Sequence, residues 1–123
     1  MLTIKNLTRT RAPSHLNFAP LTKKVLGPNY NLSLVFIGDR RARALNQRYR
    51  QKSYAANILT FPLDRSTGEI FINLRRHRAR LVDLFIHGLL HLKGLPHGSK
   101  MDALESQIFE SYRGYRQKHY HWS

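Results

Sequence analysis

The chain has 123 residues, which suits a single domain, 1–123, with a core of its own. It carries 21 Lys and Arg against 7 Asp and Glu, a formal net charge of +14. Such a field favours a polyanionic partner, nucleic acid above all, with an anionic membrane surface or a heparin-like polymer as alternatives. The absence of cysteine excludes disulfides and thiolate metal sites and fits the reducing cytoplasm. Since no stretch reaches the roughly 20 apolar residues of a membrane span and no signal peptide is apparent, we expect a cytoplasmic protein without a membrane segment.

The first half of the chain predicts two strands and two helices. Residues 2–7 alternate loosely and indicate a short strand, and residues 13–26 indicate a helix that Gly27 and Pro28 close. Residues 31–37 are apolar on both faces in their second half, which is typical of a central strand. A helix is expected to follow through about Tyr49, with Asp39 as its N-cap and Tyr49 on its inward stripe.

The second half predicts two further strands and two helices. Strands are expected at 57–61, stopped by Pro62, and at 69–73. A long helix is expected over 75–93; its second half is apolar nearly all round, so it should pass through the middle of the domain. A last helix should begin near Ser99. The pattern therefore predicts an α/β (α+β mixed) fold of about four strands packed with helices, with the 75–93 helix central.

Three histidines on and after that helix form the most specific motif in the chain. His87 and His91 are four residues apart, so both imidazoles leave one face of the helix. Gly94 can end the helix, and the chain can then turn back to bring His97 beside them. Three neutral imidazoles suit Zn²⁺ or another divalent transition metal with one position open. The alternative is a buried helix whose histidines are hydrogen-bonded core residues.

This spacing is zincin-like, but the general base of the zincins is missing. The zinc-protease pattern H-E-x-x-H-x-x-G-x-x-H requires Glu after the first histidine, and this chain has Gly88 there. Without a carboxylate at that position, peptide hydrolysis by the usual zincin route is disfavoured.

The positive charges are clustered, which favours binding to nucleic acid over a merely soluble basic surface. Neighbouring tyrosines and phenylalanines could stack on unpaired bases, as recognition of single-stranded RNA commonly requires. The candidate RNA-binding residues are Arg40, Arg41, Arg43, Arg48, Lys52, Arg75 and Arg76.

Three blocks of sequence resemble the YbeY family of bacterial rRNA maturation factors, which are also described as metal-dependent endoribonucleases. Residues 45–50 followed by 57–62 are similar to the family pattern L-N-x-x-Y-R…[DN]-V-L-S-F-P. Residues 68–73 look like its G-D-I-x-I-S strand, and residues 87–97 match its H-G-x-L-H-L-x-G-x-D-H block. The last block includes the glycine that the zincin pattern does not explain.

The resemblance implies a mixed α/β fold with a four-stranded sheet, a three-histidine metal site and a role in processing or quality control of small-subunit rRNA. It also implies that Arg50 faces the metal cleft, where we expect it to act catalytically by clamping a phosphate. The chain departs from the family pattern mainly at Ser53, Ala55, Ala56 and Pro96. None of these removes a metal ligand, but the 51–56 loop could differ in shape, and Pro96 cannot supply a supporting carboxylate.

We therefore expect a zinc-dependent, single-strand-specific endoribonuclease of small-subunit rRNA. The nucleophile is either a water or the 2′-OH of the RNA, and no general base is identifiable. Asp83 could support a ligand imidazole from the same helix face, while Asp64 and Glu69 lie near strand ends. The rival is a non-enzymatic ribosome-assembly factor that binds rRNA or a ribosomal protein and keeps the metal as a brace.

Overall fold

A four-stranded sheet with helices on both faces makes up the protein. The computed structural model describes residues 1–12, 18–77, 81–95 and 98–119, with the backbone alone at 76–77 and 112–119. In chain order the elements are β1 (Leu2–Asn6), α1 (Phe18–Leu26), β2 (Asn31–Ile37), α2 (Asp39–Arg50), β3 (Ile58–Asp64), β4 (Thr67–Asn73), α3 (Leu74–His77), α4 (Leu81–Leu92) and α5 (Ser99–His119).

The sheet is mixed, with the strand order β1-β2-β4-β3. Strands β1, β2 and β4 are parallel, whereas β3 pairs antiparallel with β4 and forms one edge. Helical connections join the parallel strands, as parallel pairing requires, and a tight turn joins β3 to β4. The predicted α/β class with a four-stranded mixed sheet is therefore confirmed.

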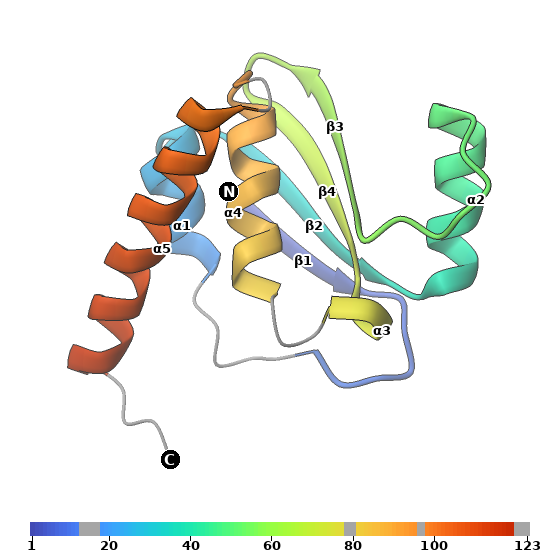
Figure 1. Cartoon of the computed structure of the whole chain (residues 1–123), viewed down its shortest axis with the longest axis horizontal. Helices are drawn as coiled ribbons and strands as arrows, with labels where there is room; N and C mark the ends of the chain where they lie inside the picture. Colours follow the sequence, from blue (N-terminus) through green and yellow to red (C-terminus); the bar gives the residue numbers. More distant parts are fainter. Residues whose placement is uncertain (13–17, 78–80, 96–97, 120–123) are drawn as a thin grey trace.

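The helices divide unequally between the two faces of the sheet. Figure 1 shows α1, α4 and α5 on one face and α2 alone on the other. On β2, Leu34 and Phe36 point into the larger core beneath α1 and α4, while Val35 and Ile37 point toward α2. This burial on both faces explains the continuous apolar run of β2, and its expected bounds, 31–37, are confirmed.

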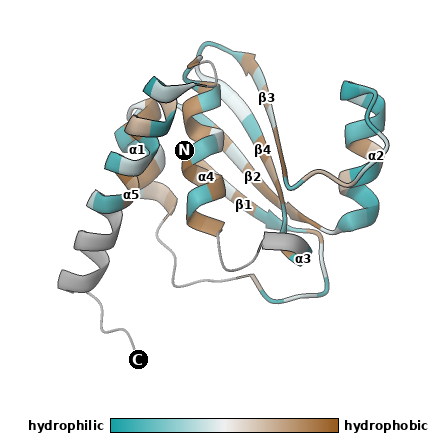
Figure 2. Ribbon diagram, in the orientation of Figure 1, coloured by the Kyte–Doolittle hydropathy of each residue, from teal (hydrophilic) through white to brown (hydrophobic). Residues whose placement is uncertain are grey.

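Helix α4 lies directly against the sheet because one of its residues has no side chain. A Cβ atom on Gly88 would lie 2.9 Å from Cδ1 of Ile58, 3.1 Å from Cδ1 of Ile70 and 3.3 Å from Cγ2 of Thr60. The surrounding turns of α4 are apolar, as their brown colour in Figure 2 shows. Gly88 therefore lets the helix approach β3 and β4 closely, which places the neighbouring His87 beside the edge strand.

Two local expectations were wrong, and a third holds only in part. The N-cap of α2 is Gly38, and Asp39 is already inside the helix. Strand β3 continues through Pro62, which an edge strand tolerates because one side of its backbone makes no ladder hydrogen bonds. Tyr49 does lie on the side of α2 that faces the sheet, where its ring packs against Phe61 of β3, but the residue is 53% exposed rather than part of the core.

The expected helix over 75–93 corresponds to α3 and α4, with residues 78–80 outside the described part. In the same way, the described part of the expected 13–26 helix is α1, Phe18–Leu26, and residues 13–17 lie outside the described residues. None of the helices in the described ranges combines the length and hydropathy needed to cross a bilayer.

The close contact at Gly88 predicts a steric effect on stability. We expect Gly88→Val to lower the free energy of unfolding by about 2 kcal/mol, because the added atoms meet packed side chains of β3 and β4. Ala44→Val in the exposed part of α2 is the matched control, and it should cost no more than about 0.7 kcal/mol of helix propensity. Urea denaturation measures both. Equal stabilities of the two variants would show that the sheet accommodates a side chain here.

Candidate active site

Two histidines of α4 present the same ring nitrogen to each other. His87 and His91 lie one turn apart on the helix, and both are half-buried. Their Nε2 atoms are 3.0 Å apart, and their rings meet edge to face with centroids 4.6 Å apart. The four-residue spacing therefore produces the expected convergence of two imidazoles.

A carboxylate from another helix fixes one of these rings. The Nδ1 atom of His87 lies 3.0 Å from Oε2 of Glu105 on α5, and each side chain is 24% exposed. A carboxylate accepts hydrogen bonds, so in the neutral imidazole the proton is on Nδ1 and the Nε2 lone pair points toward His91. Glu105 thus occupies the position beside His87 for which Asp83 was considered.

The histidine pair fits a transition metal by donor type and spacing. Two imidazole nitrogens bound to one tetrahedral zinc at about 2.0–2.1 Å lie about 3.3 Å apart, close to the 3.0 Å between these Nε2 atoms. A carboxylate on the other ring nitrogen is the usual partner of a metal-bound histidine. The third expected ligand, His97, lies outside the described residues, as does Pro96, and the described ranges by themselves hold no cluster of three metal-binding side chains.

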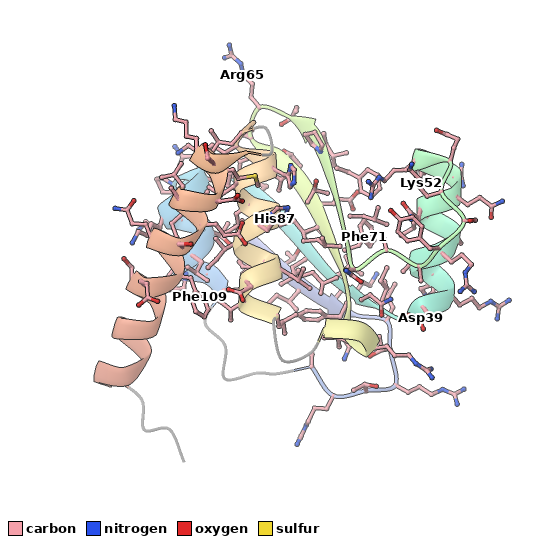
Figure 3. The ribbon with its side chains drawn as sticks, in the orientation of Figure 1. Asp39, Lys52, Arg65, Phe71, His87 and Phe109 are labelled. Carbon is pink, nitrogen blue, oxygen red and sulfur yellow. The ribbon has the colours of Figure 1, made fainter. Side chains whose placement is uncertain are left out.

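The histidines open into a cleft of about 600 Å³ along the outer edge of β3. One wall is α4, and the other is formed by the end of α2 and the loop after it, so Arg50 and Tyr54 line the same cleft as His87 and His91. Figure 3 shows His87 on the α4 side of the edge strand and Lys52, just after α2, on the opposite side. The structure thus places Arg50 in the histidine cleft, the position that the resemblance implied.

The chain turns sharply immediately after Arg50. Gln51 adopts a left-handed conformation with φ 56°, an uncommon conformation for a residue with a Cβ atom. The fully buried Asn46 then fixes the loop, since its Nδ2 donates to the carbonyl oxygen of Tyr54 at 2.9 Å. Ala55 and Ala56 are buried, so these departures from the family pattern pack the loop against the protein.

The candidate RNA-binding residues do not form one surface. Arg40, Arg41, Arg43 and Arg75 line a second cleft at the other end of α2. Arg48 and Lys52 are exposed near the histidine cleft, and the guanidinium carbon of Arg48 lies 5.4 Å from the centre of the Tyr49 ring. The side chain of Arg76 lies outside the described residues.

The other carboxylates considered from the sequence lie away from the histidine cleft. Asp64 is exposed at the end of β3, where its Oδ1 accepts a 2.8 Å hydrogen bond from the N–H of Ser66. This hydrogen bond lowers the pKa of Asp64. Neither Asp64 nor Glu69 is among the residues that line the cleft.

Two residues of the candidate site have no signal in the local sequence. Glu105 lies 18 positions after His87, and it reaches the imidazole only because α5 packs beside α4. Tyr54 lies in a loop, is 55% exposed and lines the cleft. The motif blocks could have directed attention to this loop but not to this side chain.

Comparisons with known proteins agree on one family. The family model described as Endoribonuclease YbeY matches residues 3–113. Endoribonuclease YbeY of Mycoplasma mycoides is 33% identical over an alignment of 111 residues, and the match covers 67% of this chain and 68% of that protein. Endoribonuclease YbeY of an Anaeromyxobacter species is 37% identical over 112 residues, covering 77% of this chain and 55% of the relative.

A solved structure shares the fold. The solution structure of a protein from Thermotoga maritima superposes with a TM-score of 0.64 and 22% identity, covering 96% of this chain and 93% of the other. The expectation drawn from the three sequence blocks is confirmed: the chain belongs to the YbeY endoribonuclease family.

Proposed function

We propose that this protein is a metal-dependent endoribonuclease that cleaves single-stranded RNA in the cleft beside β3. The observation that carries the proposal is the convergence of a metal-type histidine pair and an arginine in one cleft. Phosphodiester hydrolysis needs groups of these two kinds: histidines that can bind a metal ion and a cation that can bind phosphate. The high positive charge of the chain agrees with a polyanionic substrate.

His87, His91 and His97 are the proposed ligands of one zinc ion. Such an ion, when bound, supplies Lewis-acid stabilisation of negative charge at the reacting phosphate. Glu105 holds the proton of His87 on Nδ1, so the Nε2 lone pair is available for coordination. An imidazole ring that this hydrogen bond already holds loses less conformational entropy on binding the metal than a freely rotating ring would.

Arg50 is the proposed phosphate clamp. It is the last residue of α2, and the left-handed turn at Gln51 carries the chain away immediately after it. The guanidinium can donate two parallel hydrogen bonds to phosphate oxygens, and these bonds strengthen as charge develops on the oxygens in the transition state. Its role is therefore to orient the scissile phosphate and to stabilise the charge that accumulates there.

Two exposed tyrosines at the cleft support a preference for single strands. Tyr49 packs edge to face against Phe61 with centroids 5.2 Å apart, whereas no described ring contacts Tyr54. An unpaired base can stack on such a face, but a base within a duplex is already stacked and paired. We propose Tyr54 as the stacking residue next to the scissile phosphate.

Small-subunit rRNA is the proposed natural substrate, and the resemblance of the three sequence blocks to rRNA maturation factors supports it. The second candidate is a ribosome-assembly factor that binds rRNA or a ribosomal protein without cleaving it. The basic surface would serve either role, but an arginine beside the histidine pair favours the enzyme. Metal-loaded protein that binds pre-ribosomal particles and cuts no RNA would favour the assembly factor.

The support that Glu105 gives to His87 should be measurable without any substrate. We expect Glu105→Gln to weaken zinc affinity by about 10- to 100-fold, because the amide cannot hold the imidazole as a carboxylate does. Asp83→Asn, the matched change on α4, should leave the affinity as it is, and His87→Ala should abolish stoichiometric binding. Competition with a chromophoric chelator measures all three. Wild-type affinity in Glu105→Gln would remove the carboxylate from the site.

Arg50→Ala should separate catalysis from stability. We expect cleavage to fall on the order of a hundredfold, or about 2–4 kcal/mol of transition-state stabilisation, with zinc content and melting temperature unchanged. Arg50→Lys should recover little, because an ammonium group cannot form the planar two-pronged contact. Arg65→Ala removes the same charge from the β3–β4 turn, where Arg65 projects away from the cleft (Figure 3).

Kinetics for these arginine variants should use a single-stranded fragment of small-subunit rRNA and an unrelated RNA of equal length. A higher kcat/KM for the rRNA fragment would support the proposed substrate. Full activity of Arg50→Ala would exclude the clamp, whereas loss of activity in Arg65→Ala as well would indicate only a general charge effect.

Tyr54→Ala should weaken binding of single-stranded RNA by about 1–3 kcal/mol, the loss expected for one stacked base. Tyr54→Phe keeps the ring and loses only the hydroxyl, so its affinity should remain close to that of wild type. The carbonyl of Tyr54 that accepts from Asn46 is unaffected by either change. Fluorescence anisotropy with single-stranded and duplex RNA measures the effect. An equal loss for both RNA forms would argue against stacking.

A further inference from the structure

A second cleft, larger than the histidine cleft, lies at the other end of the sheet. Its volume is about 1080 Å³. Its walls are the segments that follow the carboxyl ends of the three parallel strands: residues 7–10 after β1, the first turn of α2 after β2, and Leu74 and Arg75 after β4. Figure 1 shows these three segments gathered at one end of the sheet.

This cleft lies where the connections after two neighbouring strands leave toward opposite faces of the sheet. From β1 the chain passes to α1 on one face of the sheet, whereas from the adjacent β2 it passes to α2 on the other face. Connections that leave neighbouring parallel strands in opposite directions create a crevice outside their carboxyl ends, and ligands of open α/β sheets bind in such crevices.

The lining of this cleft is strongly positive. Five arginines line it together with a single carboxylate: Arg9, Arg40, Arg41, Arg43, Arg75 and Asp39. Asp39 is engaged within the protein, since Nδ2 of Asn73 donates to its Oδ1 at 2.7 Å and Nε of Arg75 lies 3.7 Å from its Oδ2. In the described part of the chain, the other four arginines have no ion-pair partner.

The start of α2 adds backbone donors to these cations. Its N-cap, Gly38, provides no side-chain hydrogen bond, so the first N–H groups of the helix have no side-chain cap. Together with the partial positive charge of a helix N-terminus, these groups favour an anion in the cleft.

We propose that this crevice is a second phosphate-binding site, which holds the backbone of the same RNA strand that enters the histidine cleft. The inference rests on the proposed function. Helix α2 joins the two sites: its first residue, Asp39, borders the crevice, and its last, Arg50, lines the histidine cleft. A helix of 12 residues is about 18 Å long, so one extended strand can reach both sites.

The lining favours a strand of RNA over a free nucleotide. Nucleotide sites at this position of α/β folds use a glycine-rich turn that brings the backbone up to a pyrophosphate, and Gly38 is the only glycine in this lining. Arg9, Arg40, Arg41 and Arg43 are all exposed, an arrangement suited to a phosphate chain passing across the surface.

The test compares two pairs of substitutions that remove the same charge. Arg40→Gln with Arg43→Gln alters the crevice, and Lys23→Gln with Lys24→Gln alters the exposed side of α1. Fluorescence anisotropy is measured with a long single-stranded RNA and with an oligonucleotide that fills only the histidine cleft. In wild type, the longer RNA should bind more tightly.

The arginine pair should weaken affinity for the long RNA by about tenfold, and its salt slope should fall by about 0.7 for each phosphate that the crevice no longer binds. The lysine-pair variant should still bind the long RNA more tightly than the short oligonucleotide. An equal reduction in both pairs would overturn the proposal, because the effect would then come from the overall field. The proposal would also be overturned if a nucleoside triphosphate bound wild type but not the arginine pair while the RNA affinity of the arginine pair was unchanged.

These results do not depend on cleavage. If wild type cuts no RNA, the proposed function fails, yet the affinity difference between the two pairs still decides whether the crevice binds the strand. If wild type cuts RNA and the long RNA has no advantage over the short one, the crevice proposal alone fails.

Discussion

The close approach of α4 to the sheet is the constraint on which the site depends. Because Gly88 has no side chain, the helix axis lies near β3 and β4, and the apolar side chains of α4 enter the main core directly. The histidine before Gly88 is thereby held at the edge strand, in reach of the cleft wall formed by the end of α2. In the zinc proteases the residue after the first histidine carries a carboxylate; here a carboxylate at that position would collide with the sheet. The glycine that disfavours the usual zincin route is thus a requirement of the packing.

Tertiary packing also supplies the carboxylate that the three-histidine motif lacks. Pro96 stands where the family pattern has Asp, so no carboxylate can come from that position. Glu105 approaches His87 from α5 instead, and its position depends on the packing of α5 against α4 through residues such as Met101. If the proposed metal site is correct, damage to the α4–α5 interface should weaken metal binding even where no ligand is changed, because the imidazole would no longer be held in a fixed orientation.

Periodicity alone predicted the elements that are buried on one face or on both. The bounds of β2 are those expected, and the spacing of His87 and His91 gave a true convergence of two rings. Expectations were less successful where tertiary contacts decide the outcome. Tyr49 matched an inward stripe and its ring does contact Phe61 of β3, yet the residue remains 53% exposed. The arginines clustered in sequence, yet the length of α2 separates them between two clefts. Such separations depend on where a helix ends relative to its sheet, which local patterns do not encode.

Strand β3 provides one wall of the histidine cleft and is also an edge of the sheet, with one side of its backbone unpaired in the described structure. An open edge of this kind is a template on which a second chain can add a strand, and thus a route to aggregation. Pro62 has no N–H to offer such a strand, and the pairing of β3 with β4 becomes irregular between Pro62 and Asp64. The edge can therefore remain accessible to a nucleic acid while it resists the addition of another polypeptide, so an open cleft need not compromise the solubility of the free protein.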